Sequence, residues 1–339
     1  MGVDLGPIVP RRRLPLASLR GRTLAVDAAI QLYQFLSILR LKDGSPLQDR
    51  AGHVTSHLSG LLFRTVGLIA EHGVRFVFVF DGAPPELKRR EIERRREVKR
   101  KAAADYQAAL EAGDTAKAWS KLVQTTRLTS EMIADAQRLL DLLGIPWVEA
   151  PGEAEAQAAY MAANGDCWAA ESKDFDTLLF GTPRLARFVG ISGREFLPSQ
   201  GAFRKVEPEV IDLAVMLKDL SLTREQLVDA ALLIGTDFND GIKGIGPKTA
   251  VKLLRQHGNL EGLPDETRLQ LPDNFQEMRD YFLSPPTTND YELIGDRPDL
   301  DGARHFLVEE RDFTAKRVDE VLERYRHSQS PLRRLDEFG

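Results

Sequence analysis

Apolar runs alternate with helical stripes along the first half of the chain. Residues 23–27 and 74–81 form apolar runs, as strands that are buried on both faces of a sheet do. Residues 28–39 and 53–72 carry apolar side chains at helical spacing instead. Because strand and helix patterns alternate, we predict an α/β fold with a mostly parallel central sheet that helices flank. The same order continues along the chain, with strands expected at 147–149 and 167–170 and a helix at 152–163.

Two segments depart from this alternation. Residues 86–127 are long, polar and helical in pattern, with few side chains that could form a core. From about residue 207 onward we expect the chain to be helical throughout, and no internal repeat of solenoid length is present. These changes divide the chain into an N-terminal region at 1–100, a helical insertion at 86–127, an internal region at 128–258 with a helical hairpin at 235–256, a C-terminal helical part at 259–327 that packs on the core, and a tail at 328–339.

Composition places the chain among ordinary globular proteins. Its 339 residues are 42% hydrophobic and 29% charged, and the net charge of −5 does not by itself suggest a nucleic-acid-binding protein. The single cysteine, Cys167, excludes an internal disulfide framework and a cysteine-based zinc site. No apolar stretch approaches the ~20 residues that span a bilayer, and no apolar signal core follows Arg11–Arg13. We therefore predict a cytoplasmic protein with no membrane contact and no targeting signal.

Seven acidic residues stand where the predicted strands end or a helix begins. Parallel strands end at the same edge of a sheet, and ligands collect at that edge. So many carboxylates around one pocket cannot all stay ionised without cations between them. All-oxygen ligation favours Mg²⁺ or Mn²⁺ over zinc, and two such ions about 3.5–4 Å apart would activate water for phosphodiester hydrolysis. The candidate ligands are Asp27, Asp81, Glu153, Glu155, Asp174, Asp176 and Asp237.

The inference of a metal site rests on the seven acids as a group, because each acidic motif on its own has an ordinary explanation. Two aspartates two residues apart, such as Asp174 and Asp176, usually lie in an exposed loop. Two glutamates in a first helical turn usually complement the helix dipole. Glu153 and Glu155 raise a further difficulty, because residues two apart on a regular helix do not face each other. We expect one of these glutamates to act through water.

A basic run directly follows the second predicted strand. Residues 88–101 contain nine basic and three acidic side chains. Such a run is often only a solvated helix face, but a basic helix held away from the core also suits a phosphate backbone. Lys88 and Arg95 are seven residues apart and share one face. A cation there could stabilise charge that develops on a scissile phosphate.

A glycine-rich stretch at 241–248 separates two predicted helices. Gly244 and Gly246 permit a close approach of the backbone to phosphate. Together with Lys243 and Lys248, the amides at the start of the next helix would bind a DNA backbone without reading its sequence. The alternative is a structural turn that only closes a helical hairpin.

Taken together, these residues resemble the flap endonucleases, archaeal and eukaryotic in type, of the structure-specific 5′-nuclease superfamily. The resemblance covers nearly the whole chain, and the combination of motifs is specific. It is carried by Met1–Val3, Val26–Ala28, Tyr33–Phe35, Thr55–Leu58, Val79–Gly82, Pro151–Ala156, Lys173–Asp176, Gly235–Asp237 and Gly244–Lys248.

The resemblance implies a PIN-like 5′-nuclease fold and DNA substrates. The expected enzyme is a monomeric, Mg²⁺-dependent endonuclease that cuts 5′ flaps where single-stranded and duplex DNA meet. It would also degrade nicked or gapped duplexes as a 5′-3′ exonuclease, in Okazaki-fragment maturation and long-patch base excision repair. Two alternatives remain open: an excision-repair or 5′-exonuclease relative of the same superfamily, and a DNA-junction-binding protein without catalysis.

The same resemblance assigns roles to individual residues. It implies a first metal group of Asp27, Asp81, Glu153 and Glu155, and a second of Asp174, Asp176 and Asp237. Lys88 and Arg95 would contact the scissile phosphate, while residues 86–127 would form an arch and residues 40–52 a wedge against bent duplex. Further DNA contacts are implied for Tyr33, which would stack on a base, and for Phe313, Lys316 and Arg317, which would meet a short 3′ flap.

The chain departs from the family pattern in two places. Gly241 stands where many relatives have a serine that binds K⁺, so only the carbonyls of Gly241, Ile242 and Ile245 could hold that ion. The sliding-clamp (PCNA) motif of relatives is also incomplete, and we expect weaker clamp binding. Its first positions fit Gln329 and Leu332, Leu335 and Asp336 replace the expected aromatic pair, and Phe338 is a shifted remnant.

Overall fold

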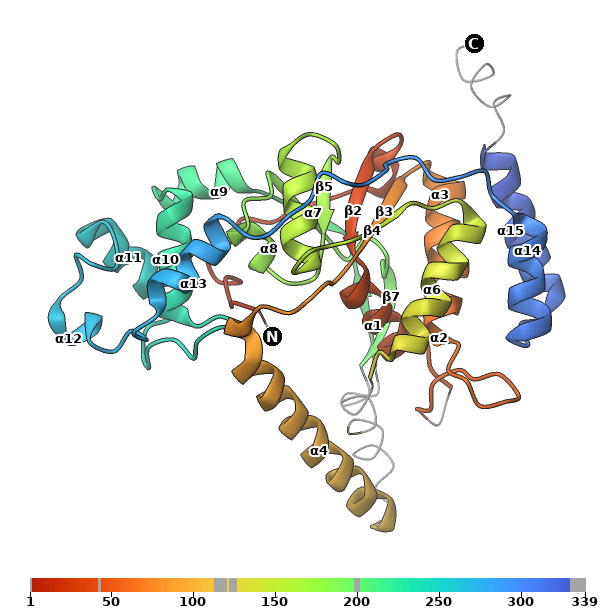
Figure 1. The fold of residues 1–339 in the computed structure, drawn as a ribbon, viewed down its shortest axis with the longest axis horizontal. Coiled ribbons are helices and arrows are strands. Elements are labelled where there is room, and N and C mark those ends of the chain that lie inside the picture. Colours follow the sequence, from red (N-terminus) through yellow and green to blue (C-terminus); the bar gives the residue numbers. More distant parts are fainter. Residues whose placement is uncertain (1, 42–43, 113–120, 122–126, 198–201, 330–339) are drawn as a thin grey trace.

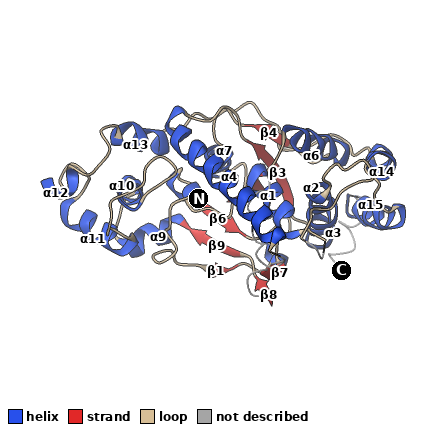
Figure 2. Ribbon diagram, turned by 90° about the horizontal axis from the view of Figure 1, so that it is seen from below, coloured by secondary structure: helices blue, strands red, loops and turns tan. Residues whose placement is uncertain are grey.

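The sheet at the centre of the molecule has seven strands in the order β1–β9–β6–β5–β2–β3–β4 (Figure 2). The computed structural model describes residues 2–41, 44–112, 121, 127–197 and 202–329. Neighbouring strands from β6 to β4 are parallel, and β9 runs antiparallel to both β6 and β1. The predicted mostly parallel sheet is therefore confirmed. Its strands are β1 (Arg12–Arg13), β2 (Thr23–Asp27), β3 (Arg75–Phe80), β4 (Trp147–Glu149), β5 (Ala169–Glu171), β6 (Arg184–Arg187) and β9 (Glu209–Asp212).

Helices flank this sheet and extend beyond it at both ends (Figure 1). One end carries α10 to α13, and the other carries α6, α14 and α15. The helices are α1 (Ala28–Ile38), α2 (Ser56–Gly60), α3 (Val66–His72), α4 (Arg89–Glu111), α6 (Ser130–Leu143), α7 (Ala154–Ala163), α8 (Asp176–Leu179), α9 (Leu213–Leu220), α10 (Arg224–Ile234), α11 (Pro247–His257), α12 (Asp265–Arg268), α13 (Phe275–Leu283), α14 (Leu300–His305) and α15 (Ala315–Gln329). Short 3₁₀ turns lie at Leu16–Leu19 and Glu86–Lys88, and π-helical turns at Leu61–Thr65 and Phe306–Glu310.

The two faces of the sheet have separate cores, because successive side chains of a strand point to opposite faces. In β2, Leu24 and Val26 join a large cluster that includes α1 and α3, whereas Ala25 joins a smaller cluster under α7. The side of α7 that meets the sheet carries Ala154 and Ala158, both fully buried or nearly so. Small side chains there let α7 lie close to the sheet. This packing brings the start of α7 to the ends of β2 and β3.

The expectation of an all-helical chain from about residue 207 onward is wrong. Residues Glu209–Asp212 form β9, which pairs with β6 and β1 inside the sheet. A separate hairpin of β7 (Gly193–Leu197) and β8 (Ala202–Val206) was also not predicted. These strands are short and carry charged residues, so no apolar run marks them. Their pairing depends on partners distant in the sequence, which a local pattern does not reveal.

Helix α4 leaves the body of the molecule as a single long projection (Figure 1). It follows Asp81 closely, with only a short loop and the Glu86–Lys88 turn between them. Most of its side chains are exposed, as the polar pattern of this segment predicted. No helix in the part of the chain that the structure describes is long and apolar enough to cross a membrane.

Candidate active site

Asp27 and Asp81 lie at the carboxyl ends of neighbouring strands. Asp27 ends β2 and caps α1, because its Oδ1 accepts a hydrogen bond from the Ile30 amide at 2.8 Å. Asp81 follows β3, and its Oδ1 accepts from the Ala154 amide at 2.8 Å. Gly82 makes this approach possible, because a Cβ at that position would lie 1.9 Å from the Ala150 carbonyl oxygen. The end of β3 and the start of α7 are therefore held together.

Glu153 and Glu155 point to different partners because α7 begins between them. Glu153 is the N-cap, with extended backbone angles (φ −80°, ψ 136°), and its side chain pairs with Lys88. Glu155 lies in the first helical turn, where its Oε1 accepts from the Ser172 hydroxyl at 2.7 Å and the Thr177 hydroxyl at 2.9 Å. Since Glu153 precedes the regular helix, the spacing of two residues does not keep both carboxylates out of one site.

Asp174, Asp176 and Asp237 complete the acidic set. Asp176 begins α8, and its Oδ1 accepts from the Val3 amide at 2.7 Å, so the first residues of the chain lie against this carboxylate. The Asp174 amide donates to the Ser172 hydroxyl, which also contacts Glu155. Asp237 follows α10 and pairs with Lys88 and Arg95. The structure thus brings acids from five separate parts of the chain to the base of α4.

Burial and mutual repulsion shift the pKa values of these acids. Burial, together with the charge of Asp81, raises the pKa of Asp27 well above its ordinary value. Burial and the charge of Asp176 do the same for Glu155. The pKa of Asp176 itself rises to about 7, mainly through burial and with repulsion from Asp237 and Asp174. Each of these shifts acts in favour of the protonated acid, and an added cation would oppose it.

Lys88 and Arg95 supply part of the positive charge that the acids need. Lys88 pairs with Glu153, and its Nζ lies 3.3 Å from Asp237 Oδ2. A guanidinium nitrogen of Arg95 lies 2.6 Å from the same Asp237 oxygen. Burial alone would raise the pKa of Asp237, but these two cations hold it below its ordinary value. The two basic residues predicted to face the scissile phosphate therefore lie directly against the acids.

The donor set fits divalent cations that prefer oxygen. Its members are all carboxylates, and each acts electrostatically on at least one other member. Among the described residues, no three acidic, histidine or cysteine side chains already stand in a ligand arrangement. Lys88 contacts both Glu153 and Asp237. Bound divalent ions would supply these carboxylates with the positive charge that Lys88 supplies to two of them in the structure.

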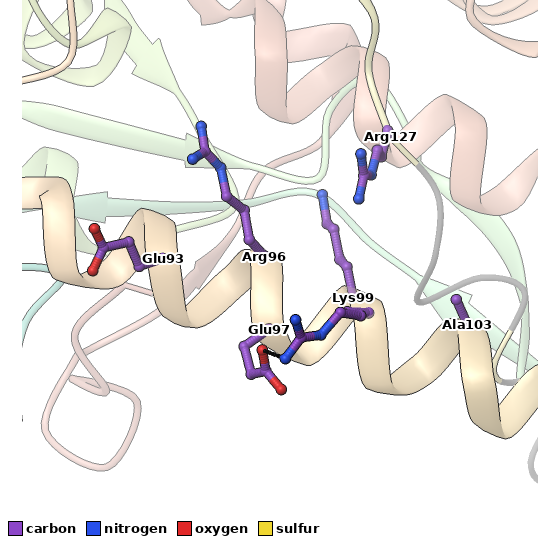
Figure 3. A pocket seen from close by; sticks show the side chains of 7 residues that line it. Glu93, Arg96, Glu97, Lys99, Ala103 and Arg127 are labelled. Atoms are coloured by element: carbon purple, nitrogen blue, oxygen red, sulfur yellow. Dashed lines mark ion pairs between the residues drawn. The ribbon is translucent and has the colours of Figure 1, made fainter.

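Tyr33 lies on α1 beside the base of α4. The Lys99 ammonium lies 5.8 Å from the centroid of its ring, and the ring is partly exposed. Next to this pair is a cavity of about 660 Å³ along α4, where Lys99 and Arg127 point toward one another (Figure 3). Burial and the charge of Arg127 lower the pKa of Lys99. The cavity is lined by Glu93, Arg96, Glu97, Lys99, Arg100, Ala103 and Arg127.

The glycine-rich stretch joins α10 to α11 as an exposed hairpin. Gly241 and Gly244 have positive φ angles of 71° and 89°, which glycine adopts without strain. Gly246 caps α11 and Pro247 opens it, so the free amides of the first turn face solvent with the exposed Lys243 and Lys248. Of the carbonyls considered for K⁺, that of Ile242 accepts a hydrogen bond from the Ile245 amide at 3.0 Å.

A second cavity, of about 140 Å³, lies where α15 begins. Of the residues assigned to a 3′-flap contact, Phe313 and Arg317 line this cavity, whereas Lys316 is exposed and is not part of the lining. Phe63 stacks with Phe313 at 6.3 Å between ring centroids, and the Arg317 guanidinium lies 4.6 Å above the Phe63 ring. The other residues that line the cavity are Gln48, Thr55, Ser59, Arg311, Asp312 and Thr314.

Of the residues assigned to the clamp motif, the structure describes one. Gln329 is exposed and is the last residue of α15. Leu332, Leu335 and Phe338 lie outside the described residues.

Sequence reasoning missed three residues that the structure places at these surfaces. Arg127 adds a positively charged side chain to the cavity beside α4, and Phe63 forms a wall of the second cavity. Tyr281, from α13, reaches Gly152 next to Glu153. Phe63 is a large aromatic residue outside the apolar stripe of its helix, which was the one signal available in the sequence. Arg127 and Tyr281 carry no such signal.

Comparison with known proteins agrees with this geometry. Residues 5–102 match the XPG N-terminal domain, and residues 144–237 match the XPG I-region. Flap endonuclease 1 of Hyperthermus butylicus is 48% identical over 332 residues, which cover 96% of this chain and 94% of that protein. Flap endonuclease 1 of Pyrococcus furiosus is 45% identical over 326 residues, which cover 96% and 94% of the two chains.

Solved structures give the same result. Flap endonuclease-1 from Methanococcus jannaschii superposes with a TM-score of 0.75 at 37% identity, covering 96% of this chain and 98% of that one. The catalytic core of Rad2 in complex with a DNA substrate superposes with a TM-score of 0.70 at 27% identity, covering 94% and 97%. These likenesses span nearly the full length of the chain and include the segments that carry the seven acids. The chain belongs to the flap endonuclease 1 family.

Proposed function

We propose that this protein hydrolyses a DNA phosphodiester at the junction between a 5′ single-stranded flap and duplex DNA. The observation that carries the proposal is the acid cluster with Lys88 and Arg95 at the base of a projecting basic helix. The acids would hold divalent ions and the helix would hold the single strand next to them. The family membership and the DNA-bound Rad2 core of similar fold support this reading.

The residues suited to hold the metals divide into two groups. Asp27, Asp81, Glu153 and Glu155 would hold one ion, and Asp174, Asp176 and Asp237 would hold the other. When bound, two Mg²⁺ ions would supply an activated water and neutralise charge on the leaving oxygen, and Mn²⁺ could replace them. The raised pKa values of Asp27, Glu155 and Asp176 support this role, because ionised carboxylates at these positions need added positive charge.

Lys88 and Arg95 would change partners during the reaction. In the structure they neutralise Glu153 and Asp237. Once divalent ions compensate these acids, both side chains would be released to face a scissile phosphate. Fixed cations at that position would stabilise the charge that develops on the phosphate in the transition state.

Three surfaces around the acids would position the DNA. The exposed hairpin with Lys243 and Lys248 would hold the duplex backbone, because its backbone amides and lysine side chains bind phosphate without reading the DNA sequence. The basic cavity beside α4 would hold the single strand, with Tyr33 stacking on a base. The cavity of Phe63 and Arg317 would contact the unpaired nucleotide of a 3′ flap. We also propose that the enzyme acts as a monomer and that its C-terminal motif binds a sliding clamp weakly.

One set of cleavage assays tests this function. Matched single-flap, double-flap and bubble DNAs would be incubated with Mg²⁺, and the product ends mapped. We expect cleavage near the flap junction with a 5′-phosphate product, and loss of cleavage with retained flap binding in Asp176→Asn. Preferred cutting of bubbles would instead favour an excision-repair relative. Binding without cleavage by the unaltered protein would make it a junction-binding protein, and normal cleavage by Asp176→Asn would refute the two-metal assignment.

A further inference from the structure

Tyr281 brings a buried hydroxyl from the C-terminal half of the chain to the acid cluster. The residue lies on α13, which packs against α10, the helix that leads to Asp237. Its hydroxyl is buried and forms no hydrogen bond of ordinary geometry among the described residues, but it lies close enough to the Glu153 carboxylate to interact with it. A buried hydroxyl without a well-formed hydrogen bond is unfavourable, so a state of the protein in which this bond improves would be favoured.

The hydroxyl lies beside the residue that precedes Glu153. A Cβ at Gly152 would lie 3.3 Å from the Tyr281 oxygen. Burial, the charge of Glu153 and a hydrogen-bonding interaction with the Glu153 carboxylate raise the pKa of the Tyr281 hydroxyl, and the charge of Lys88 opposes them. Tyr281 therefore stays protonated and can donate. Glu153 is the carboxylate with which this hydroxyl interacts most strongly and that could accept from it.

The ring of Tyr281 is fixed by two aromatic neighbours from acid-bearing segments. Phe238 directly follows Asp237, and its ring lies edge-on to Tyr281 with 5.3 Å between centroids. Phe180 directly follows the short helix that Asp176 begins, and its ring lies 6.2 Å away at 74°. One side chain thus contacts segments that carry Glu153, Asp176 and Asp237. Such packing allows the ring little freedom to turn its hydroxyl elsewhere.

We propose that Tyr281 is a positioning residue whose hydroxyl donates to Glu153 when Lys88 leaves that carboxylate. The proposal rests on the proposed function in one respect, since Lys88 must move from Glu153 to reach a phosphate. A buried carboxylate that loses its cation requires a replacement donor to keep its orientation. Tyr281 is a donor that the fold already holds beside Glu153 without a well-formed hydrogen bond among the described residues. The alternative is a tyrosine kept only for its ring, in which case Tyr281→Phe would be silent.

The first test compares Tyr281→Phe, which removes only the hydroxyl, with Tyr325→Phe. Tyr325 also has a buried hydroxyl, which donates to the Leu143 carbonyl at 2.8 Å, but it lies in the cluster of α6 and α15, away from the acids. Mn²⁺ binding would be measured directly by titration in the absence of DNA, and flap cleavage by single-turnover kinetics. We expect Tyr281→Phe to weaken Mn²⁺ binding and to slow cleavage, each about 10-fold, with flap affinity unchanged. Tyr325→Phe should leave all three unchanged.

A second test needs no catalysis. In Lys88→Ala the Glu153 carboxylate has already lost its cation, so Tyr281 should be donating to it in the free protein. Tyr281→Phe should then increase the unfolding equilibrium constant about 10-fold more in the Lys88→Ala background than in the unaltered protein. Equal effects in both backgrounds, together with unchanged Mn²⁺ binding, would overturn the proposal. If the protein fails to cut flaps, the proposed function fails, while Mn²⁺ binding and this coupling still decide the role of Tyr281.

Discussion

The acid cluster and the α10–α11 hairpin would both meet a phosphate backbone, but they present charge in opposite ways. In the cluster, Lys88 and the acids it contacts are largely buried and paired with one another. In the hairpin, Lys243 and Lys248 are exposed, and neither forms an ion pair within the described part of the chain. The first arrangement fixes a few charges in a poorly solvated place, and the second leaves them in water.

This difference separates two kinds of contribution to one reaction. Charges held in a desolvated site act strongly on a charge that develops at a fixed point, so they change the rate of chemistry. Exposed lysines release counterions when they meet DNA, so they change affinity and its dependence on salt. The two regions should therefore respond differently when a lysine is removed from each.

The largest effect is expected for Lys88→Ala, with Lys248→Ala as its matched control. Loss of Lys88 should slow single-turnover flap cleavage about 100-fold or more, with little change in the affinity for flap DNA. Lys248→Ala should leave the single-turnover rate at saturating enzyme unchanged. Single-turnover rates and dissociation constants, measured for both variants on the same flap substrate, show whether each lysine affects cleavage or binding. If Lys88→Ala lowered only the affinity for DNA, Lys88 would act like the hairpin lysines, by binding the DNA backbone and not by speeding the chemical step.

The cavity of Phe63 and Arg317 lies between these extremes, because its aromatic walls are packed while its arginine remains accessible. We expect Arg317→Ala to reduce the preference for a flap with one unpaired 3′ nucleotide about 10-fold, as the loss of one well-placed charged contact would. Lys316→Ala removes the neighbouring positively charged side chain, which does not line the cavity. That variant should retain the preference, measured as the ratio of double-flap to single-flap cleavage rates. Equal losses in both variants would indicate general attraction for DNA.

The sequence predicted the acid cluster better than the surfaces around it, for a physical reason. Asp27 and Asp81 follow apolar runs, and parallel strands end at one edge, so local pattern alone placed them together. Tyr281 and Arg127 reach their sites only through the packing of distant segments, which no local pattern encodes. Strand β9 was missed for the same reason. Its ladder partner β6 lies distant in sequence, and both strands mix charged with apolar residues.

A buried ionisable group remote from the acids tests whether burial alone produces a large electrostatic effect. His57 is fully buried in α2 with neither ring nitrogen hydrogen-bonded among the described residues, and burial lowers its pKa to about 4. Since this pKa lies below that of the unfolded chain, folding favours the neutral ring. Stability is therefore intact above about pH 6.5 and falls as pH drops from 6.5 towards 4.

Replacement of His57 by glutamine should remove this dependence. Between pH 7 and 5.5 the unaltered protein should lose about 1 kcal/mol more unfolding free energy than His57→Gln. Denaturant unfolding at the two pH values measures the difference. His53→Gln is the control, because the His53 side chain is partly exposed and paired with Asp49. A pH dependence that persists in His57→Gln would assign the effect to the acids of the cluster.

The smallest effect is expected in the hairpin, where the double variant Lys243→Ala, Lys248→Ala removes two exposed charges. Flap and plain duplex DNA should both bind a few-fold more weakly at moderate salt, and the slope of log affinity against log salt should fall by about 2. The cleavage rate at saturating enzyme should not change, since these lysines contact none of the acids. Dissociation constants measured over a range of salt concentrations test this. If the double variant lost affinity only for flap DNA, the hairpin would recognise the junction itself. Solvated charge alone would then not explain how the hairpin acts.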